Sequence, residues 1–296
     1  MEAYPLMKFK DKLDSDIGMF LGLAIGDALG APLEFQPARD PDNYVTKYMT
    51  GGAHNVSKGE FTDDTSMALA MADAFITSKA FDGKLIMHNF LKWMNEGEYS
   101  PRGVMFDCGT TILQALRKFE KDQTNPFAGS KDKFSAGNGG LMRLAPAIIF
   151  AQTKKEAVQL ARDTTRLTHG ASEAVFFSEI FAKELFCREI SDDLAEYKHP
   201  KDFSRENVLS GGYVKETYQA AWWAFQTTNS FEDCVISAVN RGYDSDTTGA
   251  VAGMIAGCFY GYGNIPVWMI ENLQWNEEII MYSRKLHNLA QERAYP

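Results

Sequence analysis

The sequence predicts an all-α protein that folds as a single compact multi-helix bundle, and two observations support this prediction. Apolar residues recur at helical spacing, as in Met67, Met71 and Phe75 and again between residues 251 and 262. No pair of alternating apolar runs is joined by Asn-Gly or Asp-Gly, so β-hairpins are not favoured.

Composition and charge narrow the class of protein. The chain has 296 residues, 45% of them hydrophobic, which is enough to build a core without disulfides. A net charge of −9 argues against nucleic-acid binding, which needs a basic face. The four cysteines form no Cys-x-x-Cys pair and the first residues contain no apolar run. We therefore expect a cytoplasmic protein with free thiols and no membrane partner.

The chain is predicted to hold one domain, residues 15–296, preceded by an N-terminal arm. The arm, residues 1–14, carries Tyr4 and Phe9 and is either a disordered tail or a contact for a partner. Two polar segments, 121–138 and 188–207, are read as loops and not as linkers. Residues 249–270 carry no charge, but glycine, asparagine and proline interrupt them. They are predicted to form a buried helix followed by a turn.

Two stripes of glycine with four-residue spacing stand out. The stripes are Gly18, Gly22, Gly26 and Gly30, and Gly249, Gly253, Gly257 and Gly261. Each interior helix glycine costs about 1 kcal/mol relative to alanine, so a compensating reason is needed. We infer that the two bare helix faces pack unusually close. If the helices are antiparallel, Glu34 and Asp246 lie at the same end of the bundle.

Two acidic clusters, residues 62–65 and 244–248, precede predicted helices. Helix capping would explain either cluster alone, because Asp, Ser and Thr are preferred N-caps. Four carboxylates with flanking hydroxyls exceed that need, and together they would repel without a cation. Their oxygens suit Mg²⁺, Mn²⁺ or Ca²⁺, and two adjacent ions can activate a water. The clusters therefore suggest a two-metal hydrolase.

A glycine-rich turn, residues 135–143, leads into an apolar helix. Such a turn presents backbone N–H groups and a helix dipole to an anion, although Asn-Gly-Gly is also a common plain turn. Beside a metal site, it suggests a substrate that carries phosphate.

These motifs together resemble the ADP-ribosylglycohydrolase family, of the type that activates dinitrogenase reductase. The matching segments, in the family's order, are residues 22–34, 62–65, 137–143, 168–169, 212–214 and 244–249. The resemblance implies an all-α fold with two Mg²⁺ or Mn²⁺ ions. It also implies hydrolysis of the bond that joins ADP-ribose to a protein side chain.

The resemblance assigns roles to particular residues. The metal ligands it implies are Thr62, Asp63, Asp64, Asp244, Asp246 and Thr247. The substrate contacts it implies are Gly137, Asn138, Gly139 and Gly140 for the diphosphate, His169 near the ribose, and Gly212 with Tyr213 at the adenine. Glu34 matches a catalytic acid that takes the water's proton or positions the substrate. Simpler alternatives stay open: Glu34 as a loop acid, His169 as a helix-end residue and Tyr213 as a core residue. Asp27 is expected to be structural.

Asp107 is predicted to determine which type of modified side chain the protein acts on. Its segment resembles the stretch in which arginine-acting relatives carry an acid facing the leaving side chain, although Asp107 could simply cap the following helix. A carboxylate can hold a guanidinium in paired charge-assisted hydrogen bonds.

The sequence thus predicts a monomeric hydrolase that removes ADP-ribose from modified proteins, most plausibly from arginine. One alternative is an immunity protein that neutralises an ADP-ribosyltransferase toxin by direct contact. The other is a hydrolase of free ADP-ribose derivatives.

Overall fold

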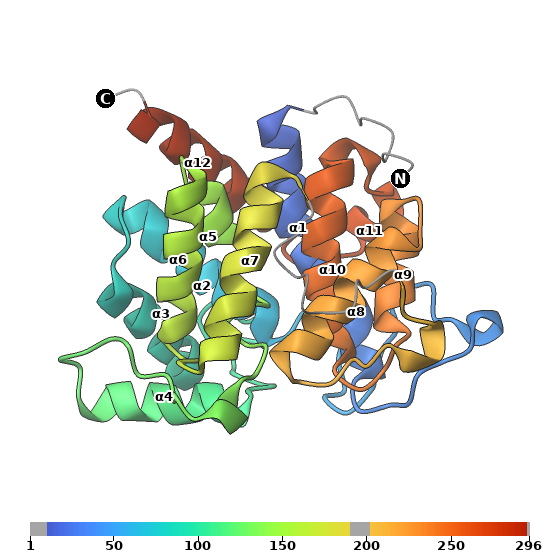
Figure 1. Cartoon of the computed structure of the whole chain (residues 1–296), viewed down its shortest axis with the longest axis horizontal. Coiled ribbons are helices and arrows are strands. Elements are labelled where there is room, and N and C mark those ends of the chain that lie inside the picture. The colour runs from blue at the N-terminus through green and yellow to red at the C-terminus, as the bar shows by residue number, and fades with distance from the viewer. Residues whose placement is uncertain (1–10, 190–201, 295–296) are drawn as a thin grey trace.

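The fold of the chain is helical throughout the residues that the computed structural model describes, which are 11–189 and 202–294. Within these ranges there are twelve α-helices and no β-strand, which confirms the predicted fold class (Figure 1). The α-helices are α1 Lys12–Gly30, α2 Asp63–Ser78, α3 Gly83–Glu96, α4 Thr110–Lys121, α5 Ala145–Phe150, α6 Lys154–Arg166, α7 Ser172–Cys187, α8 Val214–Gln226, α9 Phe231–Val239, α10 Ser245–Tyr260, α11 Val267–Glu271 and α12 Asn276–Ala294. Short 3₁₀ turns are η1 Ala31–Leu33, η2 Pro41–Asn43, η3 Lys133–Ser135, η6 Arg205–Asn207 and η7 Tyr262–Asn264.

Helices α1 and α10 form the centre of the molecule and lie side by side (Figure 1). A Cβ added to Gly22 would overlap the carbonyl oxygen of Gly253, and one added to Gly253 would overlap that of Gly22. The pairing is antiparallel, since Gly18 meets Gly257 at one end and Gly30 meets the start of α10 at the other. The close approach expected from the glycine stripes is confirmed.

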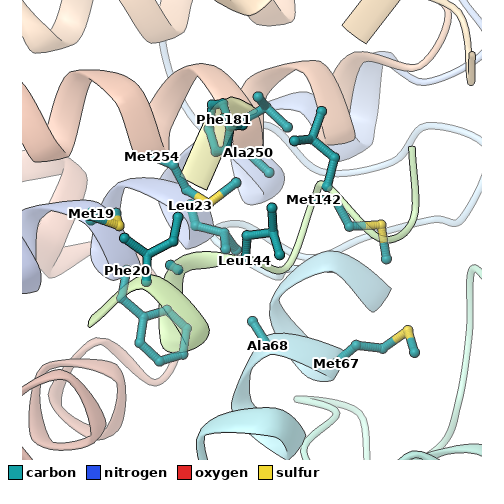
Figure 2. Packing of buried hydrophobic residues seen from close by; sticks show 14 of the residues in the cluster. Met19, Phe20, Leu23, Met67, Ala68, Met142, Leu144, Phe181, Ala250 and Met254 are labelled. Carbon is teal, nitrogen blue, oxygen red and sulfur yellow. The ribbon is translucent and has the colours of Figure 1, made fainter. Parts of the chain in front are cut away.

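Five further helices of the described chain pack directly against this central pair, on two sides. Helices α2, α5 and α12 pack against one side of α1, and α8 and α9 pack against α10 (Figure 1). Figure 2 shows buried side chains from different elements meeting near the pair, among them Met19, Phe20 and Leu23 of α1, Met254 of α10, Met67 of α2 and Leu144 before α5. Because the core is continuous, the elements that carry the acidic clusters are held rigidly.

The first helix begins earlier than the predicted arm boundary. Residues 12–14 form the first turn of α1, and the side chain of Asp11 caps it by accepting a hydrogen bond from the Leu13 N–H at 3.3 Å. The rest of the arm, residues 1–10, lies outside the described residues, as does much of the predicted loop 188–207. The other predicted loop, 121–138, contains only η3.

One segment of the described chain is long and apolar enough to cross a membrane, Lys12–Leu33, and its most apolar 18 residues are entirely buried inside the protein. It is therefore the core helix α1 with η1. The uncharged stretch that starts at Gly249 forms α10, followed by the turn η7, as predicted.

The α1–α10 contact predicts a large asymmetry between glycine substitutions. Gly253→Ala should lower the free energy of unfolding by at least about 2 kcal/mol, because the methyl group must displace backbone and not a flexible side chain. Gly109→Ala is the matched control: its Cβ would meet nothing nearer than the Ile112 Cδ1 at 3.9 Å, and the change should stay within about 0.5 kcal/mol. Urea unfolding measures both. Equal stability of the two variants would contradict the close contact.

Candidate functional site

The two acidic clusters meet at the N-termini of α2 and α10. The Thr62 hydroxyl lies 3.4 Å from Oδ2 of Asp64 and 3.4 Å from Oδ2 of Asp246. The Thr247 hydroxyl lies 3.3 Å from the same oxygen of Asp64. The N-cap residues Thr62 and Asp244 make no capping hydrogen bond with their side chains. Side-chain capping by these two residues is therefore not observed, although Asp63, Asp64 and Asp246 do lie in the first turns of their helices.

Asp27 of α1 fixes the start of α2. One carboxylate oxygen accepts hydrogen bonds from the N–H and hydroxyl of Thr62, both at 2.9 Å. The other accepts from the N–H and hydroxyl of Thr65, at 3.0 and 2.6 Å. Burial raises the pKa of Asp27 to about 6, although these hydrogen bonds oppose the rise. Asp27 has the structural role that the sequence predicted.

The carboxylates at this meeting point are buried and crowd one another. Burial raises the pKa values of Asp63, Asp64 and Asp246 well above their ordinary range, and neighbouring carboxylates raise them further. Within the described residues, Oδ1 of Asp64 is buried with no hydrogen-bond partner. A set of oxygen donors with one buried oxygen unpaired fits a hard divalent cation such as Mg²⁺ or Mn²⁺.

His54 is a site residue that the sequence did not reveal. Its Nε2 lies 2.6 Å from Oε2 of Glu34 and 3.5 Å from Oδ1 of Asp107. These three side chains bring potential ligand atoms within 4.8 Å of one another, so they form a second group able to hold a cation. Burial first, and then Asp107 and Asp244, raise the pKa of Glu34 to about 9. In the metal-free protein at neutral pH, the Glu34 carboxyl therefore keeps its proton.

The segment around His54 gave no sequence signal because a lone histidine among glycines matches no motif. The structure holds this segment as a tight turn: Gly51 and Val56 exchange two backbone hydrogen bonds of 2.8 Å. Gly52, with a positive φ of 72°, packs directly on the backbone of Pro32. The turn therefore fixes the imidazole against the residue that follows η1, which is Glu34.

Asp107 does not cap the helix that follows it. Helix α4 has Gly109 as its N-cap and no side-chain capping bond, so that alternative is wrong. The backbone of Asp107 is left-handed, with φ of 48°, and directs the carboxylate toward His54. Its Oδ2 is buried and has no hydrogen-bond partner among the residues described. A half-satisfied carboxylate in a pocket wall is ready to accept a donor from a ligand.

The carboxylates open into a cavity of about 200 Å³. The predicted site residues that line it are Glu34, Asp63, Asp107, Gly137, Asn138, Gly139, His169, Gly212, Asp244, Asp246 and Thr247. Thr62 and Asp64 are fully buried and do not line it. Gly140 faces Thr165 instead of the cavity. The structure therefore brings most of the predicted site to one place, while the individual roles stay predictions.

The glycine-rich loop lies against His169. A Cβ at Gly139 would stand 2.7 Å from Cε1 of His169, so a side chain there would displace the ring. Asn138, predicted to contact the diphosphate as part of this loop, lines the cavity and has a further contact through its side chain. Its amide donates to Thr217 and to Asp244, both at 2.8 Å, and so holds a predicted metal ligand.

The buried Arg143 orients His169. This arginine belongs to the glycine-rich motif, but the sequence alone suggested no role for it. Arg143 donates to the Thr168 hydroxyl at 2.6 Å, and that hydroxyl lies 2.9 Å from Nδ1 of His169. The hydroxyl accepts from arginine and contacts Nδ1, so this chain of contacts holds the imidazole ring in place. Burial lowers the pKa of His169 to about 3, so the ring is neutral, and its Cε1 and Nε2 face the glycine loop. His169 also lies at a helix end, since its N–H donates to the carbonyl of Thr165 in the last turn of α6 at 2.8 Å, so the helix-end alternative stays open.

A groove of about 610 Å³ adjoins the cavity and shares Gly137 and Gly212 with it. Tyr213 lines this groove, half-buried, and its hydroxyl donates to Glu173 at 2.8 Å. Phe134 lines it as well and is 88% exposed. Tyr213 is therefore a wall residue and not a core tyrosine, in a place that suits a flat ring.

The fold and the site define a class: an all-α hydrolase with an oxygen-lined cation centre beside a glycine-rich anion loop. The family model of the ADP-ribosylglycohydrolases matches residues 10–296. The chain belongs to the ADP-ribosylglycohydrolase family and is a hydrolase of the glycosidase class.

Similarity to individual relatives extends over nearly the whole chain. The chain is 34% identical to ADP-ribosylarginine hydrolase Tri1 of Pseudomonas putida, over 94% of this chain and 79% of that protein. It is 31% identical to ADP-ribosyl-[dinitrogen reductase] glycohydrolase of Rhodospirillum rubrum, over 90% of this chain and 92% of that protein. A solved ADP-ribosylglycohydrolase-related protein complex contains a chain that matches with a TM-score of 0.78 and 34% identity, covering 95% of this chain and all of that one.

The buried carboxylates predict an unusual pH dependence of the metal-free protein. Between about pH 4 and pH 6, folded Asp27 keeps a proton that the unfolded chain releases. The folded state then binds more protons, so the free energy of unfolding should fall as pH rises through this window, and the other raised carboxylates extend the fall. Thermal melts in EDTA measure it. An increase in melting temperature from pH 4 to pH 6 would contradict the raised pKa values of the buried carboxylates.

Asp64→Asn tests the cation directly. It should stabilise the metal-free protein, because it removes one buried charge, and it should abolish the increase in melting temperature that Mg²⁺ or Mn²⁺ causes. For the wild type, that increase should be larger at high pH, where protons compete less. Asp163→Asn, a substitution on α6 outside the site, is the control and should keep the increase. An unchanged increase in Asp64→Asn would exclude Asp64 as a ligand.

Proposed function

We propose that the protein hydrolyses the N-glycosidic bond between ADP-ribose and an arginine side chain of a modified protein. The observation that supports this most is the position of Asp107. Its carboxylate lies beside Glu34 in the cavity wall with one oxygen unpaired within the described chain. Two relatives, from Pseudomonas putida and Serratia proteamaculans, are named ADP-ribosylarginine hydrolases and are 34% and 33% identical to this chain.

The residues proposed to hold two Mg²⁺ or Mn²⁺ ions lie on two helix starts. They are Thr62, Asp63 and Asp64 before and in α2, and Asp244, Asp246 and Thr247 before and in α10. When bound, the ions supply Lewis acidity, anchor the ribose hydroxyls and lower the pKa of a bound water.

Glu34 is proposed to handle the proton of the attacking water. The Glu34 carboxyl, whose pKa burial and neighbouring acids raise to about 9, can act as a base only after it gives up its own proton, and Nε2 of His54, 2.6 Å from its Oε2, is placed to take that proton. The carboxylate then accepts the proton of the attacking water, while the first proton stays on the imidazole. Glu34 works here as one carboxylate beside metals, unlike the paired acids of ordinary glycosidases.

The other end of the substrate is proposed to occupy the glycine loop and the groove. Backbone N–H groups of the loop and the neutral His169 N–H donate toward the diphosphate and ribose. Tyr213 and the groove beside it offer a surface for the adenine. The arrangement orders the substrate from groove to cavity, with the scissile bond next to Glu34.

The physiological partner is proposed to be an ADP-ribosylated protein in the cytoplasm, acted on by a monomer of this chain. The immunity alternative, direct contact with an ADP-ribosyltransferase toxin, is not favoured. Its proposed contact lies largely in residues 1–10, outside the described part of the chain. Hydrolysis of free ADP-ribose derivatives is the second alternative.

Asp107→Ala should lower kcat/KM for ADP-ribosyl-arginine at least about tenfold, about 1.4 kcal/mol of barrier, because the guanidinium loses its charged partner. Asp107→Asn should also be impaired, since it keeps the shape and loses the charge. Binding of Mn²⁺ by the ligands proposed on α2 and α10, which do not include Asp107, should be unaffected in both variants. Efficient release of ADP-ribose from serine by the wild type, without release from arginine, would overturn the arginine assignment.

Asp246→Ala should abolish hydrolysis and leave the protein folded, because the remaining ligands cannot hold both ions. Release of radiolabelled ADP-ribose from arginine-, serine- and aspartate-linked model proteins measures it, with circular dichroism as the control for folding. EDTA dialysis of the wild type should have the same effect, reversed by added Mg²⁺ or Mn²⁺. Normal turnover in EDTA would contradict the metal centre.

A further inference from the structure

Two exposed aromatic residues flank the site in strained backbone. Phe35 follows Glu34 and is 69% exposed, and Tyr243 precedes Asp244 and is 56% exposed. Both have left-handed backbone, with φ of 61° and 54°. Bulky residues rarely adopt this conformation, which suits glycine or asparagine. Folding alone thus gives no reason for aromatic side chains at these positions.

The surrounding structure imposes the strain. The N–H of Phe35 donates to the carbonyl of Tyr243 at 2.7 Å, and the N–H of Tyr243 donates to the carbonyl of Gln36 at 2.7 Å. Gly242, with φ of 67°, packs directly on the backbone of Gln36 and Pro37. The two segments are therefore locked together, and both aromatic side chains are held in fixed places facing solvent. Strain that the scaffold maintains in this way is typical of functional surfaces.

A third exposed apolar residue lies on a segment that a backbone hydrogen bond joins to Asp244. Leu209 is 59% exposed, and the next residue, Ser210, accepts the backbone N–H of Asp244 at 2.9 Å. We call Phe35, Leu209 and Tyr243 the apolar rim. Single exposed apolar residues are ordinary, but three on interlocked segments beside an active site mark a contact surface.

The rim lies on the side of the site where the leaving group must depart. The ring of Phe35 lies 6.0 Å from that of His54, which contacts both Glu34 and Asp107. The groove proposed for adenine is lined by other residues, Tyr213 and Phe134 among them. The rim therefore adjoins the side chain that is released and not the nucleotide.

We propose that the apolar rim docks the polypeptide that carries the ADP-ribosyl group, through apolar side chains next to the modified arginine. This inference rests on the proposed function and adds the recognition of the protein part of the substrate. The rim is continuous with the proposed site of the modified side chain, and this identifies what binds there. When a modified side chain reaches Glu34 and Asp107, the backbone and neighbouring residues of its own protein lie over Phe35 and Tyr243.

The test compares a small substrate with a protein substrate. Phe35→Gly, Tyr243→Gly and the double variant are assayed on ADP-ribosyl-arginine and on an ADP-ribosylated protein. For the double variant, kcat/KM on the protein should fall at least about tenfold, mainly through KM, while kcat/KM on ADP-ribosyl-arginine stays within about twofold. The melting temperature should be unchanged or higher, because glycine relieves the left-handed strain.

Val267→Ser is the matched control. Val267 is 64% exposed and follows η7, which contacts the start of α1 through a Gly263–Asp14 hydrogen bond of 2.9 Å, at the end of α1 away from the site. It should leave both activities unchanged. Equal losses on both substrates, no loss on either, or a clear drop in melting temperature would each overturn the docking role. A wild type without activity on either substrate would overturn the proposed function, and this inference with it.

Discussion

The contact between the bare faces of α1 and α10 is the constraint on which the rest of the structure depends. Because the backbones touch along the whole stripe, from Gly18–Gly257 to Gly30 against the start of α10, neither helix can slide or turn relative to the other. The end of α1 leads directly to Glu34, and the start of α10 carries Asp244 and Asp246. Two segments more than 200 residues apart are thereby fixed within one site.

The site sacrifices stability for function. Buried carboxylates raise one another's pKa values, and without a cation their ionisation opposes folding. The fold tolerates this because hydrogen bonds outside the cluster hold its framework. Asp27 fixes the start of α2 through four hydrogen bonds, and Asn138 holds Asp244. With this framework in place, Oδ1 of Asp64 and Oδ2 of Asp107 stay without a hydrogen-bond partner among the described residues and are available to ligands.

The pocket divides its tasks between two chains of contacts. On the reaction side, His54 joins Glu34 to Asp107, so the residue proposed to move a proton and the one proposed to hold the leaving group share a partner. On the nucleotide side, Arg143 and Thr168 hold the ring of His169 beside the glycine loop. Both chains start from parts of the fold that are tightly packed, which keeps the intervening cavity pre-organised.

The sequence by itself determined the helical class, the glycine contact and the acidic clusters, because helical spacing and residue chemistry are local properties. It also placed Glu34 with Asp246, since the stripes imply an antiparallel pair. Only the tertiary structure decided that Asp107 lines the cavity instead of capping α4, and that Asn138 holds Asp244. His54, Arg143 and the strained Phe35 emerged only there. Their roles depend on neighbours distant in sequence and on backbone dihedral angles, which no local pattern encodes.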